Sequence, residues 1–365
     1  MSGSITAGSD ERTGESYPDG IDTVGRRLLY DLVSIPSVSG EEATAVDRLV
    51  AFFEANDRTA AIDEVGNVHA PGDDDLLLTS HVDTVPGDIP VEVNDGEEGP
   101  ALWGRGSVDA TGALCAMAIA AVETGASFVG VVGEEYDSRG AHHLVETRTA
   151  PGAVINGEPS GWDGITLGYR GLLSGTYLAT SESGHTSRPD PNAIEEAIAW
   201  WNRVEAAFES DEWTSVFEQV TTKPIGFDGG ISDDGLSMEA MMDVQLRIPP
   251  EMTVDAVRER ADAELETGTV NWDVPVPPVM CDHRSELARA FRVAIRAAGG
   301  DPRLLRKTGT SDMNIYADAW DCPMVTYGPG DSALDHTPEE HLPLEEFDRS
   351  IDVLIEVCDR MGVGE

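Results

Sequence analysis

The sequence predicts an α/β fold, in which a mostly parallel sheet lies between helices and a smaller α+β domain is inserted. Three observations support this prediction. Apolar runs of strand length alternate with segments whose apolar residues recur at helical spacing, which is typical of α/β domains. The strand-like run at 127–133 is nearly all apolar, as expected for a strand that is buried on both faces. The chain of 365 residues is also long enough for two domains that each bury a core.

The first part of the chain is expected to supply helices and strands in turn. Apolar residues recur at helical spacing between 21 and 33 and predict a first helix. Ser39, followed by two glutamates, signals the start of a second helix at 41–54. The elements expected next are a strand ending at His81, a helix at 113–122, and strands at 127–133 and 153–157.

The pattern changes near residue 164. A β-α-β-α-β order is expected there, with strands at 166–180, 236–247 and 270–276 and helices at 192–208 and 254–265. The first domain then resumes, with a helix at 285–298, a strand at 323–327 and a closing helix at 344–361. The expected organisation is a disordered tail at 1–20, a discontinuous domain at 21–163 and 279–365, and an inserted ferredoxin-like domain at 164–278.

The chain is strongly acidic, with 24 Lys and Arg against 68 Asp and Glu and a formal net charge of −44. The acidic residues are spread along the whole chain rather than gathered in a tail. Such a charge argues against general binding to nucleic acids or anionic membranes. At molar salt the screening length falls to about 3 Å, and the self-repulsion largely disappears. We therefore expect a cytoplasmic protein from a cell with a very salty interior.

The cysteines and the N-terminus favour the same location. The four cysteines are widely spaced and form no C-x-x-C pair, which is typical of small core residues in a reduced compartment. Residues 1–20 are polar and acidic, and they have no apolar run that would suit a signal peptide. No apolar run elsewhere reaches the roughly 20 residues that a membrane-spanning helix needs.

Five side chains suited to metal binding lie at expected strand ends, at a helix entrance or in a loop: His81, Asp109, Glu135, Glu158 and His336. Two histidines with three carboxylates suit zinc or a similar divalent ion. Five ligands exceed one tetrahedral site but fit two ions that share a carboxylate, for which Asp109 is the natural bridge. A single histidine at a strand end is more often structural, but five coincidences are harder to explain in that way.

Two acidic residues beside these candidates have separate expected roles. Asp83 follows His81 by two residues and could orient its imidazole. Glu134 adjoins a candidate ligand and is expected to act as the general base, which takes a proton from water and passes it to a leaving amine. Three other histidines lack such a flanking pattern and are expected to be structural or surface residues: His142, His143 and His341.

Five motifs hold these residues: His81-Val82-Asp83-Thr84-Val85-Pro86, Gly104-Arg105-Gly106 with Asp109, Gly133-Glu134-Glu135, Gly157-Glu158-Pro159 and Asp335-His336-Thr337-Pro338. In order and spacing they resemble the M20 metallopeptidase family, from about residue 21 to the end of the chain. The resemblance implies a zinc-peptidase-type catalytic domain with two Zn²⁺ or Co²⁺ ions. One ion would be held by His81 and Glu158. The other would be held by Glu135 and His336, with Asp109 bridging.

The inserted domain would be the lid of that family, through which its members commonly form homodimers. The segment around His185 is similar to the lid histidine segment, so that His185 would reach the partner subunit's site and stabilise an oxyanion. Arg247 resembles the lid arginine that holds a substrate carboxylate. A loop outside the lid resembles the family's substrate-binding loop, in which N–H groups and hydroxyls receive a carboxylate: Gly309, Thr310 and Ser311.

The stretches 133–141 and 156–171 are similar to the branch of the family that releases lysine or ornithine from a small acidic amino-group carrier protein, LysW. That resemblance implies cleavage of the amide bond between the carrier's C-terminal glutamate and the amino acid, in lysine or arginine biosynthesis. Alternatives are a deacylase of N-acetylornithine or N-succinyl-diaminopimelate, a carboxypeptidase, or a non-catalytic binding protein. A small basic cluster is expected either to meet carboxylates of the carrier or substrate or to be a solvated surface: Arg303, Arg306 and Lys307.

Overall fold

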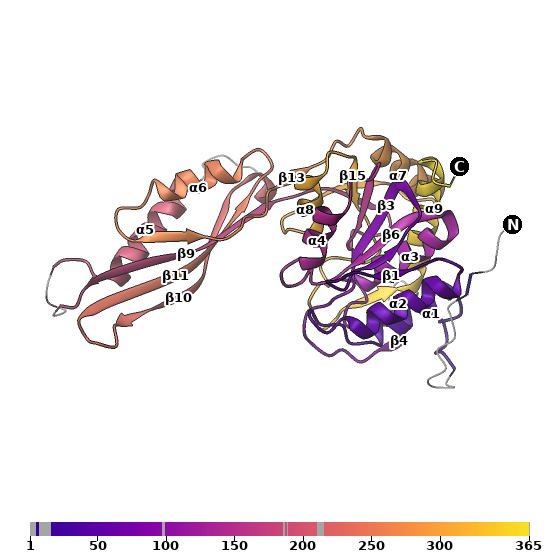
Figure 1. Ribbon diagram of the computed structural model, residues 1–365, viewed down its shortest axis with the longest axis horizontal. Helices are drawn as coiled ribbons and strands as arrows, with labels where there is room; N and C mark the ends of the chain where they lie inside the picture. Colours follow the sequence, from indigo (N-terminus) through magenta and orange to yellow (C-terminus); the bar gives the residue numbers. More distant parts are fainter. Residues whose placement is uncertain are drawn as a thin grey trace. The chain divides into compact units, whose positions relative to one another are not determined.

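The computed structural model describes residues 5–6, 16–96, 99–184, 187, 189–209 and 215–364 (Figure 1). The chain divides into two compact units, each of which is described here by itself. Unit 1 comprises Met1–Leu167, Cys281–Leu305 and Ile315–Glu365. Unit 2 comprises Gly168–Met280 and Arg306–Asn314.

Unit 1 is built on a mixed sheet whose centre is parallel. Along the sheet the strands follow the order β1 (Ala61–Ile62), β2 (Val68–Ala70), β6 (Ala126–Val131), β3 (Asp73–His81), β7 (Val154–Gly157), β15 (Met324–Thr326) and β8 (Gly164–Tyr169). Strand β3 pairs in parallel with both β6 and β7, and β7 pairs in parallel with β15. The carboxyl ends of these four strands therefore meet at one edge of the sheet.

The chain passes between the units along β8, which also pairs with β13 (Val279–Met280) and β14 (Arg303–Lys307). A second, antiparallel sheet in unit 1 has the order β16 (His341–Pro343), β5 (Gly99–Trp103) and β4 (Glu92–Gly96).

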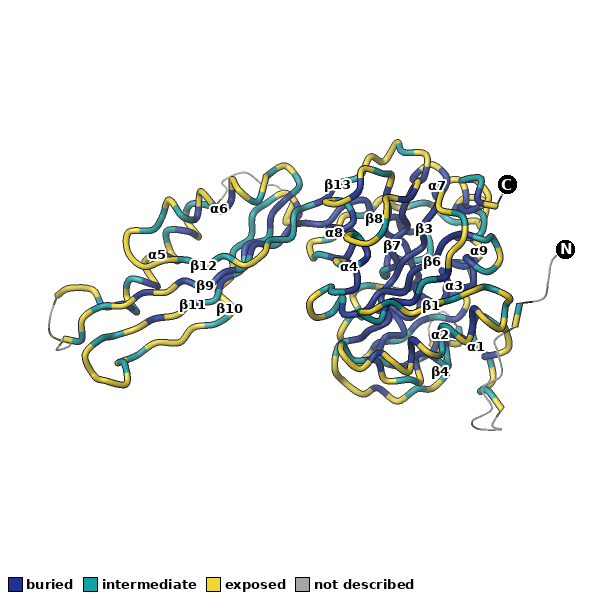
Figure 2. Tube along the Cα trace, viewed as in Figure 1, coloured by how far each residue is buried: buried dark blue, intermediate teal, exposed yellow. Residues whose placement is uncertain are grey.

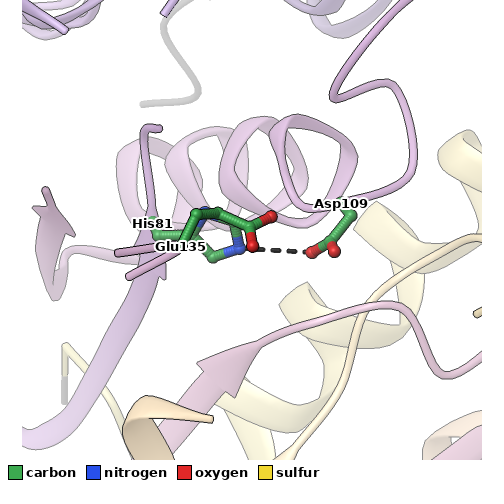
Figure 3. A group of neighbouring side chains, drawn as sticks. All are labelled: His81, Asp109 and Glu135. Carbon is green, nitrogen blue, oxygen red and sulfur yellow. Dashed lines mark hydrogen bonds and ion pairs between the residues drawn. The ribbon is translucent and has the colours of Figure 1, made fainter. Parts of the chain in front are cut away.

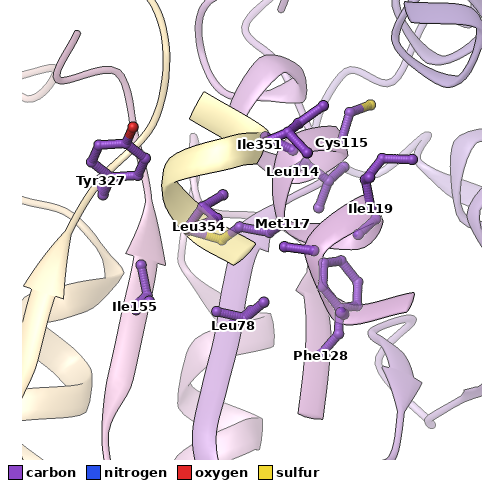
Figure 4. Close-up of a cluster of buried hydrophobic side chains, with 14 of the residues drawn as sticks. Leu78, Leu114, Cys115, Met117, Ile119, Phe128, Ile155, Tyr327, Ile351 and Leu354 are labelled. Carbon is purple, nitrogen blue, oxygen red and sulfur yellow. The ribbon is translucent and has the colours of Figure 1, made fainter. Parts of the chain in front are cut away.

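A central apolar helix, α3 (Thr111–Thr124), packs against the sheet of unit 1 and against two of its helices. This helix contacts β3, β6 and β7 as well as two other helices, so that it is buried on all sides and needs no polar face. Figure 4 shows its Leu114, Met117 and Ile119 among side chains of the sheet and of the C-terminal helix. The other helices here are α1 (Val24–Val33), α2 (Ala43–Ala55), α4 (Arg139–Thr147), α7 (Glu286–Ala297), α9 (Leu344–Arg360) and, across the unit boundary, α8 (Asp312–Ala319).

In its described residues, unit 2 is a four-stranded antiparallel sheet with two helices against one face. The strand order is β10 (Thr221–Ile231), β11 (Ser237–Ile248), β9 (Gly171–Glu182) and β12 (Thr269–Trp272). The helices are α5 (Ala193–Phe208) and α6 (Val254–Asp262), with a short 3₁₀ turn at Val216–Glu218. Burial alternates along β9 and β11, as Figure 2 shows, and the buried side chains, including Tyr177 and Trp200, form a core of their own.

The structure differs from the sequence expectations in three places that concern the domains. The strand expected at 166–180 is two strands, β8 and β9, with Arg170 between them. The inserted domain has four strands rather than three, because β10 was not predicted. Residues 279–365 were all expected in the first domain, but 306–314 belong to unit 2, where the carbonyl of Thr308 accepts a hydrogen bond from Arg170.

The cysteine and membrane expectations can be compared with the described residues. All four cysteines are free thiols; Cys115 and Cys358 are buried, but Cys281 and Cys322 are only partly buried and so are not full core residues. Within the described part of the chain, no helix is both long and apolar enough to cross a bilayer.

Candidate metal centre

Parallel strands bring the predicted ligands to one edge of the sheet. Strand β3 ends at His81, β7 ends immediately before Glu158, and β6 ends four residues before Glu135. Ligand sites of open α/β sheets lie at such carboxyl ends. Asp109 precedes the N-terminus of α3, where the helix dipole favours an anion, and His336 lies in the loop between β15 and β16. Five positions far apart in the sequence thus converge.

Asp109 lies between the two imidazoles. Its Oδ1 is 3.2 Å from Nε2 of His81, and its Oδ2 is 3.2 Å from Nε2 of His336. Nε2 of His336 is also 3.1 Å from Oε1 of Glu135. Nε2 of His81 is 4.0 Å from Oε1 of Glu158. Figure 3 shows His81, Asp109 and Glu135, whose ligand atoms all lie within 4.8 Å of one another. The structure therefore gathers all five predicted ligands.

This donor set fits divalent metal ions. Each oxygen of Asp109 faces a different imidazole, which is the arrangement that a bridging carboxylate requires. Nδ1 of His81 lies 2.9 Å from the backbone carbonyl of Asp83, so that the ring presents its other nitrogen to the carboxylates. Imidazole nitrogens and carboxylate oxygens together suit zinc and related first-row ions.

Asp83 holds the neighbouring acidic segment more directly than it holds His81. Its buried carboxylate accepts hydrogen bonds from the backbone N–H groups of Glu134 and Glu135, both at 3.0 Å, and from the hydroxyl of Ser39 at 2.7 Å. By contrast, Oδ1 of Asp83 is 3.7 Å from Nδ1 of His81. The imidazole is thus oriented by the backbone carbonyl of Asp83, while the carboxylate positions the predicted base and one ligand. The expected contact of Asp83 with the imidazole is thus made by its backbone carbonyl.

A tight turn presents those two N–H groups to Asp83. Gly133, two residues after the end of β6, takes φ = 79°, in the left-handed region that favours glycine. Its carbonyl accepts hydrogen bonds from the N–H groups of Tyr136 and Asp137, at 3.3 and 3.0 Å. The turn therefore requires the positive φ of Gly133, which explains the glycine of the Gly-Glu-Glu motif.

In the absence of metal, the titratable groups of the centre shift one another's pKa values. Burial opposes a positive charge on His81, but the hydrogen bond with Asp109 and the nearby carboxylates of Glu158 and Glu134 outweigh it and raise the pKa of His81. The hydrogen bond with Asp109 raises the pKa of His336 to about 9. Burial would raise the pKa of Asp109, but its hydrogen bonds with His336 and His81 lower it. A metal ion bound there would compete with the proton of a charged imidazole, because a histidine ligand must be neutral.

The pKa of Glu135 shifts in the opposite direction to the pKa of Asp109. Burial, followed by the negative charge of Asp109, raises the pKa of Glu135. A divalent ion between the two carboxylates would remove this conflict, because it would favour the charged form of both groups. The centre therefore has a surplus of negative charge that suits a bound cation.

The expected substrate-binding residues lie in unit 2, and the structure brings two of them together. Nη1 of Arg247, on β11, donates a hydrogen bond to the hydroxyl of Thr310 at 3.4 Å. Burial lowers the pKa of Arg247. In the same loop, Gly309 is exposed and the N–H of Ser311 donates to Oδ1 of Asn314 at 3.0 Å. The predicted oxyanion residue, His185, lies outside the described residues.

The predicted basic cluster is divided between the units, and its arginines are paired. Nε of Arg303 donates to Oδ1 of Asp163 at 2.8 Å within unit 1. Nη1 of Arg306 donates to Oε1 of Glu218 at 3.3 Å within unit 2 and lies over the ring of Phe217. These pairings favour the alternative of a solvated surface.

The three histidines expected to be structural or surface residues are not among the gathered side chains. His143, on α4, has its Nε2 3.6 Å from Oε1 of Glu64, and His142 on the same helix is exposed. The His341 ring stacks on Trp103 with centroids 4.3 Å apart.

Two residues that the sequence analysis did not assign to the site do support the centre: Ser39, through Asp83, and Glu340. Glu340 has a visible signal, since it follows His336 by only four residues.

Sequence comparison finds known proteins that match most of this chain. The chain is 38% identical over 368 residues to the LysW-lysine hydrolase of Deinococcus radiodurans, covering 93% of this chain and 97% of that protein. It is 31% identical to the LysW-lysine/LysW-ornithine hydrolase of Sulfurisphaera tokodaii, covering 88% of this chain and 91% of that protein.

Solved structures show the same fold at lower sequence identity. The aminopeptidase PepT of Bacillus cereus superposes with a TM-score of 0.74 at 19% identity, covering 93% of this chain and 99% of the other. The M20 metallo-carboxypeptidase Sso-CP2 of Sulfolobus solfataricus gives a TM-score of 0.69 at 17% identity, covering 92% and 99%. The model of peptidase family M20/M25/M40 matches residues 77–360, which include all five gathered ligands. The chain therefore belongs to the M20 peptidase family.

Proposed function

We propose that this chain is a metal-dependent amide hydrolase that releases lysine or ornithine from the C-terminal glutamate of the carrier protein LysW. The observation that carries the hydrolase assignment is the position of Asp109, whose two oxygens lie 3.2 Å from Nε2 of His81 and of His336. The substrate assignment is supported by the relatives named above, which match nearly the full chain at 31–38% identity.

The centre would hold two Zn²⁺ or Co²⁺ ions. His81 and Glu158 would bind one ion, Glu135 and His336 the other, and Asp109 both. Bound there, the ions supply Lewis acidity to the scissile carbonyl and to the attacking water. The pairing is supported by the distances, because Nε2 of each imidazole lies within 4.0 Å of both carboxylates with which it would share an ion.

The protein's own groups would then move the proton and hold the substrate. Glu134 would take a proton from water and pass it to the leaving α-amine, and the hydrogen bond from its N–H to Asp83 fixes its backbone. Arg247 and the loop of Gly309, Thr310 and Ser311 would bind a substrate carboxylate. His185 of a partner subunit would stabilise the oxyanion.

The exposed edge of the unit 2 sheet supports the proposal that the chain forms a homodimer through this unit. Strand β10 is an outer strand there, and an outer strand offers unpaired backbone groups to a second chain. It also exposes three large apolar side chains, with 48–64% of each accessible: Ile225, Phe227 and Ile231. Exposed apolar groups beside an open strand edge are typical of a protein–protein contact.

The cellular setting we propose is the cytoplasm of a salt-rich cell. The supporting observation is the net charge of −44, whose repulsion molar salt would screen. The same screening would allow an acidic carrier to approach this acidic enzyme, since like charges otherwise oppose association. Activity should therefore be measured in molar KCl.

The decisive experiment is identification of the product. The protein is incubated in molar KCl with Zn²⁺ or Co²⁺ and with carrier loaded with lysine or ornithine, and the free amino acid is measured by mass spectrometry. Parallel reactions with N-acetylornithine, N-succinyl-diaminopimelate and dipeptides test the deacylase and carboxypeptidase alternatives. Release from the carrier at the highest kcat/KM supports the proposal. Hydrolysis of the small substrates alone would assign one of the alternatives.

A single variant tests the role of the base. Glu134→Gln should lower kcat by about 10²- to 10⁴-fold, because general acid–base catalysis contributes that much, while the bound metal is retained. Glu339→Gln removes an exposed carboxylate near His336 and serves as the matched control. Unchanged hydrolysis in Glu134→Gln would assign the proton transfer to another group. Absence of hydrolysis in the unmodified chain would favour a binding role.

A further inference from the structure

Glu340 is a buried carboxylate that contacts the loop carrying Asp109. The residue is 1% exposed, and it lies just before β16. Its Oε1 accepts hydrogen bonds from the backbone N–H groups of Val108 and Asp109, at 3.0 and 3.2 Å. Its Oε2 accepts a hydrogen bond from Nη1 of Arg105 at 2.7 Å. Its own carbonyl accepts the N–H of Gly104 at 3.4 Å.

These contacts are more specific than burial of a charge requires. A carboxylate removed from water is costly unless both oxygens are hydrogen-bonded, and here both are. Hydrogen-bond donors at other positions of the loop would satisfy these two oxygens equally well. Instead one oxygen receives the N–H of Asp109 itself and that of the residue before it, so that the backbone from which the bridging side chain projects is fixed.

A second buried carboxylate, that of Asp83, makes the same kind of contact with another segment of the centre. The carboxylate of Asp83 accepts the consecutive N–H groups of Glu134 and Glu135, as that of Glu340 accepts those of Val108 and Asp109. Both carboxylates are at most 1% exposed. Glu340 also follows His336 by four residues, so that it connects the segment bearing one ligand with the loop bearing another.

We propose that Glu340 is a positioning residue for the metal centre: it fixes the backbone of Asp109 so that each oxygen of that carboxylate faces one imidazole. This inference rests on the proposed function, because it takes the five gathered residues as metal ligands. Glu340 contacts Arg105 and the loop backbone, not the ligand side chains, so it acts through Asp109. Its loss should affect metal affinity before it affects substrate binding.

The test measures metal affinity in variants that remove or retain the acceptor. Glu340→Ala removes both oxygens and should weaken Co²⁺ and Zn²⁺ binding by about 10- to 100-fold, as loss of groups that orient metal ligands commonly does. Glu340→Gln keeps one oxygen that can accept the two N–H groups and should recover most of that affinity. Glu340→Asp keeps the charge, but its shorter side chain cannot reach the loop and Arg105 together, so its affinity should lie between. Glu339→Ala is the matched control and should bind as the unmodified chain does.

Two readouts separate positioning from a purely structural role. Affinity is obtained by competition with a chromophoric chelator, and the visible spectrum of bound Co²⁺ reports its coordination. Thermal unfolding of the metal-free variants measures the structural contribution. A lowered unfolding temperature with unchanged metal affinity and an unchanged Co²⁺ spectrum would overturn the proposal. If Glu340→Ala does not fold, the same comparison between Glu340→Asp and Glu340→Gln decides it.

Failure of this inference is distinguishable from failure of the proposed function. If the unmodified chain binds two ions and hydrolyses its substrate, but Glu340→Ala and Glu340→Asp bind metal equally well, only the positioning role is wrong. If the unmodified chain binds no divalent ion, the metal centre itself is wrong and the positioning role is rejected with it.

Discussion

His81 and His336 face the same carboxylate, but they are held in different ways. His81 ends β3, its side chain is 1% exposed, and its Nδ1 lies 2.9 Å from the backbone carbonyl of Asp83. His336 lies in a loop with φ = 61°, and its side chain is 51% exposed. The first imidazole is fixed by the sheet before any ion binds, whereas the second depends on its loop and on the carboxylates it faces. The comparison predicts two unequal ion positions.

The largest effect is expected when each of the two histidines is replaced by alanine. His81→Ala should abolish tight binding at its position and lower activity by more than the roughly 10- to 100-fold that loss of an orienting group costs. It also leaves a cavity at a buried strand end, so the free energy of unfolding should fall. His336→Ala should retain one ion, at the position of His81, and its free energy of unfolding should fall less than that of His81→Ala, because the side chain of His336 is 51% exposed and leaves no buried cavity.

Metal content and unfolding curves measure this difference. His143→Ala, which removes a partly buried histidine on α4, is the control for loss of a histidine outside the centre. Equal metal loss and equal destabilisation in His81→Ala and His336→Ala would show that the two positions are equivalent, against the comparison.

The second prediction concerns pH in the metal-free protein. The pKa of His336 is raised to about 9 by its hydrogen bond with Asp109, whereas an unfolded histidine titrates near 6.5. Because the folded pKa is higher, the protonated imidazole stabilises the fold fully below about pH 6.5, and this contribution is lost as the pH rises through about 9. The unfolding temperature of chelator-treated protein should therefore fall between these pH values.

A variant assigns that pH dependence. His336→Gln removes the titrating group, so its unfolding temperature should fall less over the same range. Some dependence should remain, because the pKa of His81 is also raised. Equal slopes for the two proteins would show that the solvent-exposed imidazole contributes no pH-dependent stability.

The side of the centre built on strands was predictable from the sequence, and the reason is physical. Apolar runs long enough for buried strands end at His81 and just before Glu158, and parallel strands bring such ends together. The supporting contacts were not predictable in the same way. Asp83 acts on the N–H groups of Glu134 and Glu135, and a backbone donor has no signature in the sequence.

The missed elements also have identifiable causes. Strand β10 contains Pro224 and three glycines, residues that are depleted in strands, and its register shifts between Pro224 and Gly226. An outer strand with a bulge tolerates such residues, but its sequence does not reveal it. The assignment of 306–314 to unit 2 depends on contacts such as the one between Arg170 and Thr308, which no local pattern announces.

The smallest effect is expected from loss of the Ser39 hydroxyl, which contacts the carboxylate of Asp83. Ser39 donates to Oδ2 of Asp83 at 2.7 Å, and Ser39→Ala removes one of the three hydrogen bonds that this carboxylate accepts from Ser39, Glu134 and Glu135. A hydrogen bond to a charged group contributes about 1.5–3 kcal/mol, so urea unfolding should show a loss near the lower end of that range, while the two N–H contacts stay in place.

Because those contacts hold the base segment, kcat of Ser39→Ala should fall only a few-fold, and metal affinity should not change. Ser34→Ala, at an exposed position close by in the sequence, is the control. If Ser39→Ala instead lost metal as His81→Ala is expected to do, the His81 position would depend on this hydroxyl rather than on the sheet. The contrast between a fixed and an adaptable imidazole would then have to be given up.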